Sequence, residues 1–238
     1  MAEGQHEQRH GVSSGFVSFS EDSGTLGGYL TRLDDGQAHP GVILIQEWWG
    51  IEPHIQDLCG RLARAGYVVL APDLYHGQVA AEPDEANKAM MALNKDTAVD
   101  EIIQALDYLR SRDDVQPKRL GMIGFCMGGL LTWRTAERVG GELAAIVPFY
   151  AGHYRPTAES ISGITAPALV IWGAADDSIP ASDREEIIGL LTEADKTFKA
   201  IIYPAGHAFM NDQRPTHARE SAEDAWSELL SWLSRYLG

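Results

Sequence analysis

Cysteine and long apolar runs are both scarce in this chain of 238 residues. Its two cysteines, Cys59 and Cys126, are too few for a disulfide framework, which is typical of a reduced compartment. Apolar runs such as residues 42–45 have the length of a strand, far below the ~18 residues that a membrane span needs. The first ten residues are polar and lack the apolar core of a signal peptide. We therefore expect a cytoplasmic protein without a membrane span.

Positive charge is scarce as well: the chain has 19 lysines and arginines but 34 acidic residues, which gives a net charge of −15. Cations lead the binding of nucleic acids and anionic lipids, so we expect neither as a partner. A small-molecule substrate stays open, since only the local field at a site matters there. The sequence leaves open a monomer or a small homo-oligomer. Cysteine and histidine spacings typical of zinc sites are missing, so we expect no metal and no organic cofactor.

The N-terminus is expected to be a flexible segment of residues 1–12. His6 and His10 lie four residues apart, a spacing that would suit a metal on a helix, but a frayed terminus is the favoured interpretation. No linker, internal repeat or low-complexity stretch interrupts the remainder, so residues 13–238 are expected to form one domain.

Strand and helix patterns alternate along this domain. Strands are expected at residues 16–20, 26–32, 41–46, 67–71, 120–125, 144–150, 168–172 and 198–203. Helices are expected at residues 53–65, 96–110, 128–139, 181–192 and 216–237. The first two strands favour an antiparallel hairpin, and the alternation that follows predicts an α/β fold. We therefore expect about eight strands in a mostly parallel sheet, with helices on both faces.

The string G-F-C-M-G-G, residues 124–129, lies where the strand at 120–125 runs into a helix. It matches the G-x-S-x-G nucleophile elbow with Cys126 in place of serine. Such a turn exposes the thiol, and the positive end of the following helix favours the thiolate. The amide of Met127 is then one donor of an oxyanion hole. A small buried core cysteine is the alternative. A dinucleotide site is the other alternative, but G-x-G-x-x-G is missing.

Two further side chains follow strands in the order that α/β-hydrolases use, which is nucleophile, acid, histidine. Asp176 comes just after the strand at 168–172 and can orient a histidine. His207 follows the strand at 198–203. Taken singly, each is better explained as an ordinary turn or loop residue, but the shared placement favours a catalytic triad. Asp177 is a rival acid that is expected to face solvent or to cap the next helix.

Together these motifs show that the chain resembles the dienelactone hydrolase (carboxymethylenebutenolidase) family of α/β-hydrolases. The resemblance runs from about residue 41 to the end, and its most specific parts are Q-E-W-W-G (46–50) and G-F-C-M-G-G. The other matching pieces are A-P-D-L-Y (71–75), the turn 173–180 and G-H-A-F (206–209). It implies a Cys-Asp-His triad of Cys126, Asp176 and His207.

The resemblance also gives roles to the loop after the strand at 41–46. In the family the glutamate that matches Glu47 interacts with the resting cysteine and swings aside when substrate binds. The amide of Trp48 would be the second oxyanion donor. Trp49, Tyr75 and Phe209 are expected to line the substrate cleft with apolar surface.

The chain departs from the family at two positions. Gly77 and Asn211 stand where well-studied members place arginines that grip a substrate carboxylate, and neither can form such a charge-assisted contact. His76, Arg155 and Arg214 are possible substitutes. We therefore expect a hydrolase of small esters or lactones that accepts neutral substrates. An α/β-hydrolase-fold binding protein with little or no catalysis is the alternative.

Overall fold

The computed structural model describes residues 11–19 and 26–238. The expected flexible segment lies mostly outside these residues, as do His6 and His10, and the first strand begins at Val12. Within the described residues, no helix combines the length and the apolar character needed to cross a membrane.

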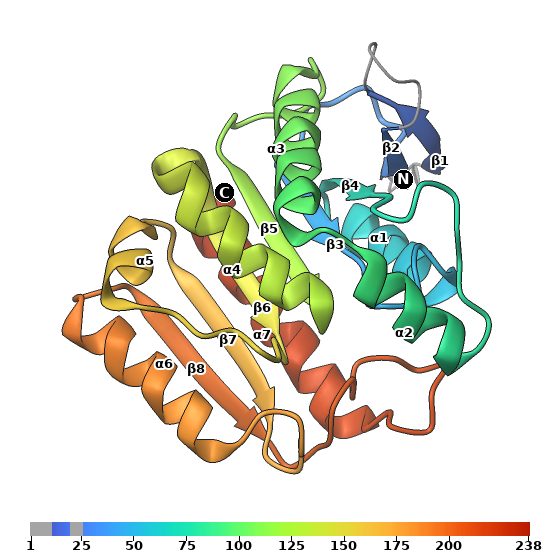
Figure 1. Ribbon diagram of the computed structural model, residues 1–238. Helices are drawn as coiled ribbons and strands as arrows, with labels where there is room; N and C mark the ends of the chain where they lie inside the picture. The colour runs from blue at the N-terminus through green and yellow to red at the C-terminus, as the bar shows by residue number, and fades with distance from the viewer. Residues whose placement is uncertain (1–10, 20–25) are drawn as a thin grey trace, which may run out of the picture.

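One eight-stranded sheet organises the chain, as the sequence predicted (Figure 1). Its strands are β1 (Val12–Ser18), β2 (Gly27–Leu33), β3 (Gly41–Ile45), β4 (Val68–Pro72), β5 (Leu120–Phe125), β6 (Leu143–Phe149), β7 (Ala168–Gly173) and β8 (Phe198–Tyr203). Their order in the sheet is β1-β2-β4-β3-β5-β6-β7-β8. β1 pairs antiparallel with β2, and β2 with β4, whereas all later neighbours are parallel.

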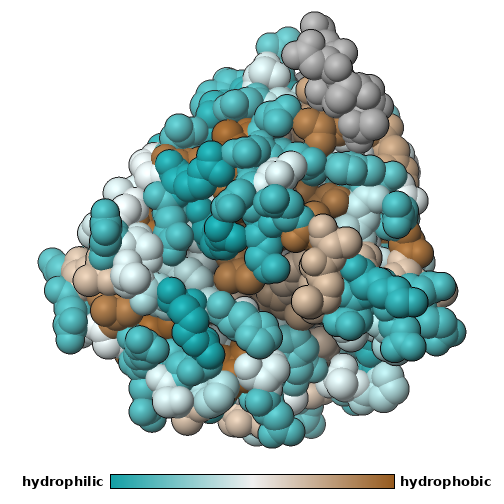
Figure 2. Space-filling model, viewed as in Figure 1, coloured by the Kyte–Doolittle hydropathy of each residue, from teal (hydrophilic) through white to brown (hydrophobic). Residues whose placement is uncertain are grey.

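Helices cover both faces of this sheet, with α3 and α4 in front and α1 and α7 behind in the view of Figure 1. The helices are α1 (Pro53–Arg64), α2 (Pro83–Ala92), α3 (Lys95–Ser111), α4 (Met127–Val139), α5 (Ala158–Gly163), α6 (Ala181–Glu193) and α7 (Arg219–Leu237). Residues of β3 through β7 are buried throughout, as expected for parallel strands covered on both faces. The outer surface over α3 and α4 is largely hydrophilic (Figure 2), in keeping with the acidic composition.

Several elements differ from the sequence prediction. The short helices α2 and α5 were not expected, because each buries a single residue, Ala86 and Ile161, and so shows no apolar stripe. β1 begins at Val12, four residues before the predicted start. The prediction missed these residues because most of their side chains are exposed and the alternation is weak. α7 begins at Arg219 rather than at residue 216.

The parallel strands end at one edge of the sheet, because their carboxyl ends share a direction. The loops that follow β3, β4, β5, β7 and β8 therefore gather there. These loops carry Glu47, Tyr75, Cys126, Asp176 and His207.

Candidate active site

Cys126 stands at the sharp turn between β5 and α4, with φ 55° and ψ −114°. This left-handed conformation is strained for a residue with a side chain and is typical of functional turns. Two glycines make the turn possible. A Cβ at Gly128 would lie 2.5 Å from the Ile45 carbonyl oxygen, and one at Gly129 would lie 2.6 Å from the Phe149 carbonyl oxygen. The ends of β3 and β6, the strands on either side of β5, thus lie too close to the first turn of α4 for any side chain at these two positions.

The structure brings the thiol of Cys126 to His207, although the two residues are 81 positions apart in sequence. His207 Nε2 lies 3.0 Å from Cys126 Sγ, and His207 Nδ1 lies 2.6 Å from Asp176 Oδ2. Asp176 is buried, whereas Cys126 and His207 are partly open to solvent. The three side chains form one continuous hydrogen-bonded chain from a buried carboxylate to an accessible sulfur.

The electrostatics of this chain favour a protonated imidazole. Burial disfavours the charged ring, but hydrogen bonds to Asp176 and Cys126, together with their negative charges, outweigh it and raise the pKa of His207 to about 10. For the Asp176 carboxyl, burial by itself raises the pKa. The hydrogen bonds from His207 and Ser178 outweigh burial, and the pKa of Asp176 is lowered. The arrangement can therefore hold a protonated imidazole between the Asp176 carboxylate and the Cys126 sulfur, and it can deliver a proton from Nε2.

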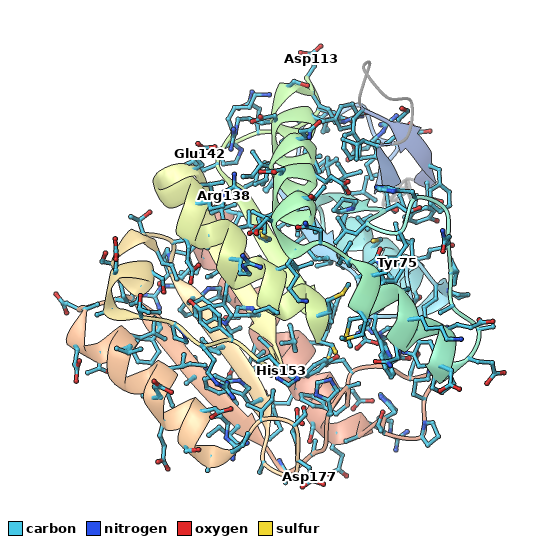
Figure 3. The ribbon with its side chains drawn as sticks, viewed as in Figure 1. Tyr75, Asp113, Arg138, Glu142, His153 and Asp177 are labelled. Carbon is cyan, nitrogen blue, oxygen red and sulfur yellow. The ribbon has the colours of Figure 1, made fainter. Side chains whose placement is uncertain are left out.

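Asp176 and its rival Asp177 lie in different surroundings. Asp177 is exposed and points outward at the end of the loop after β7 (Figure 3). Asp176 turns inward, where Ser178 donates to Oδ1 from both its hydroxyl, at 2.5 Å, and its backbone N–H, at 3.0 Å. Sequence reasoning missed Ser178, although D-x-S is a recognised local turn pattern in which Asp accepts from the residue two positions on.

A buried arginine holds the same loop at both ends. Arg184, in the first part of α6, donates from one nitrogen to the carbonyl oxygens of Gly173 at 3.1 Å and Ile179 at 2.8 Å. These two carbonyls bracket Asp176. Sequence reasoning missed Arg184 as well, because its acidic neighbours in D-R-E-E (183–186) are typical of a solvated helix face.

Glu47 is buried and has a partner for each carboxylate oxygen. Tyr150 donates its hydroxyl to Oε1 at 3.1 Å, and the amide of Asn211 donates to Oε2 at 2.8 Å. Burial raises the pKa of Glu47, and these hydrogen bonds only partly offset it. The resemblance led us to expect Glu47 beside the resting cysteine. In this structure its hydrogen bonds go to Tyr150 and Asn211, and Cys126 is bonded to His207.

The two expected oxyanion donors come from the loop after β3 and from the start of α4. Met127 is the first residue of α4, so its N–H has no partner within the helix. Trp48 lies two residues beyond Gln46, whose carbonyl oxygen a Cβ at Gly128 would meet at 2.6 Å. The turn that carries Trp48 thus begins against the start of α4.

The expected cleft residues differ in their access. Tyr75 is mostly buried, and its hydroxyl lies 3.6 Å from Met127 Sδ, so it stands next to the elbow. The prediction for Phe209 is wrong in this structure, because it has no exposed surface and lies behind Tyr150 with ring centroids 5.6 Å apart. Trp49 is also buried, beneath the Arg214 guanidinium at 3.7 Å from the ring centroid.

The two positions that depart from the family also differ. A Cβ at Gly77 would meet nothing within 4 Å, so this position leaves open space. Asn211, in contrast, is fully buried, so its amide does not line open space. Beside Tyr75, under α2 and α3, lies a cavity of about 280 Å³ whose lining includes His76, Leu93 and Glu101.

Each expected substitute cation already faces a carboxylate. Arg214 donates to Glu52 at 2.7 Å, and Arg155 lies 2.7 Å from Asp183. His76 Nε2 lies 3.1 Å from a carboxylate oxygen of Glu101. A carboxylate on a substrate would have to compete with these acids.

The second cysteine, Cys59, gives a prediction. Its side chain on α1 has no exposed surface, and burial raises the pKa of its thiol well above the usual range. Because the thiolate is the reactive form, we expect iodoacetamide to modify Cys126 and to leave Cys59 unmodified in the folded protein. Peptide mass mapping after native and denaturing labelling checks this. Rapid native modification of Cys59 would contradict its burial.

The sheet, the strained elbow, and the acid and histidine at neighbouring strand ends define an α/β-hydrolase. The model of the dienelactone hydrolase family matches residues 26–237, and this chain belongs to that family. It is a carboxylic ester hydrolase of the kind that the sequence predicted.

Two relatives illustrate the match. A Yersinia pestis protein named "Putative carboxymethylenebutenolidase" is 33% identical over 248 residues, which cover 96% of this chain and 91% of that protein. A crystal structure described as "Putative Dienelactone Hydrolase" from Klebsiella pneumoniae superposes with a TM-score of 0.86 at 29% identity, covering 95% of this chain and 100% of the other.

Proposed function

We propose that this protein hydrolyses small esters or lactones through a covalent acyl-enzyme, with Cys126 as nucleophile and His207 as acid and base. The observation that carries the proposal is the continuous chain from Cys126 Sγ through His207 to Asp176, with separations of 3.0 and 2.6 Å. Asp176 would hold the imidazole in the useful orientation and stabilise its charge. Glu47 would stay in its buried site during this chemistry.

The reaction would begin when the Cys126 thiolate attacks the carbonyl carbon and forms an S–C bond. The π electron pair of the carbonyl then moves onto its oxygen. The N–H groups of Met127 and Trp48 would stabilise that oxyanion. When the carbonyl reforms, the ester C–O bond breaks and the proton on His207 Nε2 passes to the departing alkoxide. Neutral His207 then takes a proton from water, which attacks the thioester. The products are a carboxylic acid and the free thiolate, and His207 is protonated again.

A burst experiment tests this mechanism. With p-nitrophenyl acetate in excess, we expect a rapid release of one p-nitrophenolate per enzyme, followed by a slower steady rate. Mass spectrometry after an acid quench should find the acetyl group on Cys126. A binding protein that kept the fold without the chemistry would give no burst and no acetylated Cys126. Acetylation at another residue would overturn the assignment of the nucleophile.

Substrate charge gives a further prediction. Gly77 supplies no cation, Asn211 is buried, and Arg214 is paired with Glu52. A charge-assisted contact is worth about 1.5–3 kcal/mol, or about 10- to 150-fold in affinity. Without two such contacts, we expect neutral, fairly apolar esters or lactones to be hydrolysed at least as well as dienelactone.

The measurement compares kcat/KM for dienelactone and for a neutral acyl ester at two salt concentrations. An attractive cation at the site would favour the anionic substrate most at low salt. A preference of a hundredfold or more for the carboxylate substrate would show that Arg214, Arg155 or His76 leaves its acidic partner to bind it.

A further inference from the structure

Asn211 makes an unusual pair of contacts for a fully buried amide. Its Nδ2 donates to Glu47 Oε2 at 2.8 Å and to Glu52 Oε1 at 3.1 Å, so one nitrogen serves two carboxylates. Its Oδ1 accepts the backbone N–H of Gln213 at 3.1 Å, which fixes the amide with its nitrogen toward the acids. Both glutamates are buried, and a donor shared by two buried carboxylates satisfies an oxygen of each.

The two glutamates are the ends of a single short turn, residues 47–52, that joins β3 to α1. Trp48 lies inside it. The middle of the turn is tight, because Gly50 has φ +93° and a Cβ there would lie 2.7 Å from the Gln78 carbonyl oxygen. Asn211 therefore ties together the first and last residues of the segment that carries the proposed oxyanion donor.

The end of the turn at Glu52, its outer end, is held by an ion pair with Arg214. Glu52 directs its second oxygen to Arg214 at 2.7 Å, and Arg214 in turn covers the Trp49 ring. The Glu52 side chain makes no capping bond to α1, so its buried carboxylate is not used to begin that helix. The end at Glu47, the inner end, is held by the hydrogen bond from the Tyr150 hydroxyl. The Tyr150 ring stands edge-on to His207, with ring centroids 5.2 Å apart.

We propose that Asn211 is a positioning residue for ester cleavage: by holding Glu47 and Glu52 at once, it sets the turn that presents the Trp48 N–H to the oxyanion. This inference rests on the proposed function. It differs from a role at the sulfur, because Cys126 is held by His207 and not by this network.

Two reactions of Cys126 separate these roles. Acylation by p-nitrophenyl acetate builds negative charge on a carbonyl oxygen and needs the oxyanion donors. Alkylation by iodoacetamide displaces iodide from carbon, builds no oxyanion, and reports only on the thiolate. A defect in the turn should slow the first reaction and spare the second.

Glu52 offers the sharpest variants, because Glu47 keeps both of its own partners when Glu52 is changed. Glu52→Leu removes the acceptor that Glu52 offers to both Asn211 and Arg214, whereas Glu52→Gln keeps an oxygen for Asn211. Asn211→Leu removes both contacts. Gln213→Ala is the matched control, because this exposed neighbour contributes only its backbone N–H to Asn211. Thermal denaturation of each variant confirms folding.

Losing one oxyanion donor costs about 10²–10³-fold in kcat, and a displaced donor should cost less. We expect Glu52→Leu and Asn211→Leu to slow acylation by about 10- to 100-fold, in kcat more than in KM. Glu52→Gln loses the charge that faces Arg214 but keeps an oxygen, so it should lose clearly less acylation than Glu52→Leu, whereas Gln213→Ala should stay within about threefold of the unmodified protein. Alkylation of Cys126 in Glu52→Leu should also change by less than about threefold.

The inference fails if folded Glu52→Leu acylates normally, or if its acylation and alkylation fall together. Should Asn211→Leu not fold, the comparison of Glu52→Leu with Glu52→Gln decides alone. Failure of the proposed function is a different result, since the unmodified protein would then show no burst and no acetylated Cys126.

Discussion

Replacing Cys126 with alanine is expected to lower kcat/KM for a neutral activated ester by at least about 10³-fold, or about 4 kcal/mol of transition-state stabilisation. The reason is that, in the proposed mechanism, the thiolate forms the covalent bond on which every later step depends. The remaining rate over water would come from the oxyanion donors and from binding alone. The fold should be unaffected, because Cys126 packs only partly against the core and alanine tolerates its turn no worse.

The measurement is steady-state kinetics together with burst amplitude, on protein whose thermal unfolding matches the unmodified chain. Cys59→Ala is the matched control, since it removes the other thiol and should leave the burst intact even if stability falls. Turnover by Cys126→Ala within tenfold of the unmodified protein would rule out Cys126 as the nucleophile.

The second large effect is expected at Asp176. Asp176→Asn should lower kcat by about 10²–10⁴-fold, because an amide at the 2.6 Å contact no longer holds the imidazole in the useful tautomer or stabilises its charge. Asp177→Asn is the matched control, and its exposed side chain predicts a change of less than about threefold. If Asp177→Asn were the more damaging variant, the acid would be misassigned by one residue.

The pH profile gives the same variant a second readout. His207 must be protonated to give Nε2–H to the leaving group, and its pKa is raised to about 10. Activity should therefore persist at neutral pH and fall as pH rises through about 10. Removing the carboxylate of Asp176 removes a contribution that raises the pKa of His207, so the alkaline limb should move to lower pH in Asp176→Asn. An unchanged limb would show that Asp176 does not act on the imidazole.

Much of the fold follows from local patterns. Strands such as residues 120–125 are short, continuous apolar runs, and α1 has an apolar stripe, so each is visible within its own segment. α2 and α5 bury almost nothing and leave no such pattern. Their positions depend on the surrounding loops rather than on an apolar face of their own.

The site divides in the same way. Cys126, Asp176 and His207 each follow a strand, and parallel topology alone brings strand ends together. Tyr150 was missed, because its bond to Glu47 spans 103 residues. Asn211 was interpreted only as the position of a missing arginine, yet it is a buried donor to two acids. The identity of a side chain does not reveal which distant groups it will meet in the folded chain.

The burial of Cys59 has a consequence for folding dynamics. Its thiol lies in the core on α1, so a reagent can reach it only when that part of the molecule opens. When closing is faster than labelling, the rate of native-state modification at Cys59 measures the population of the open form, and when labelling is faster it measures the opening rate itself. Labelling of the Cys59 thiol on α1 therefore reports on local unfolding of this part of the core. The accessible thiol of Cys126 reports in the same sample on the turn between β5 and α4.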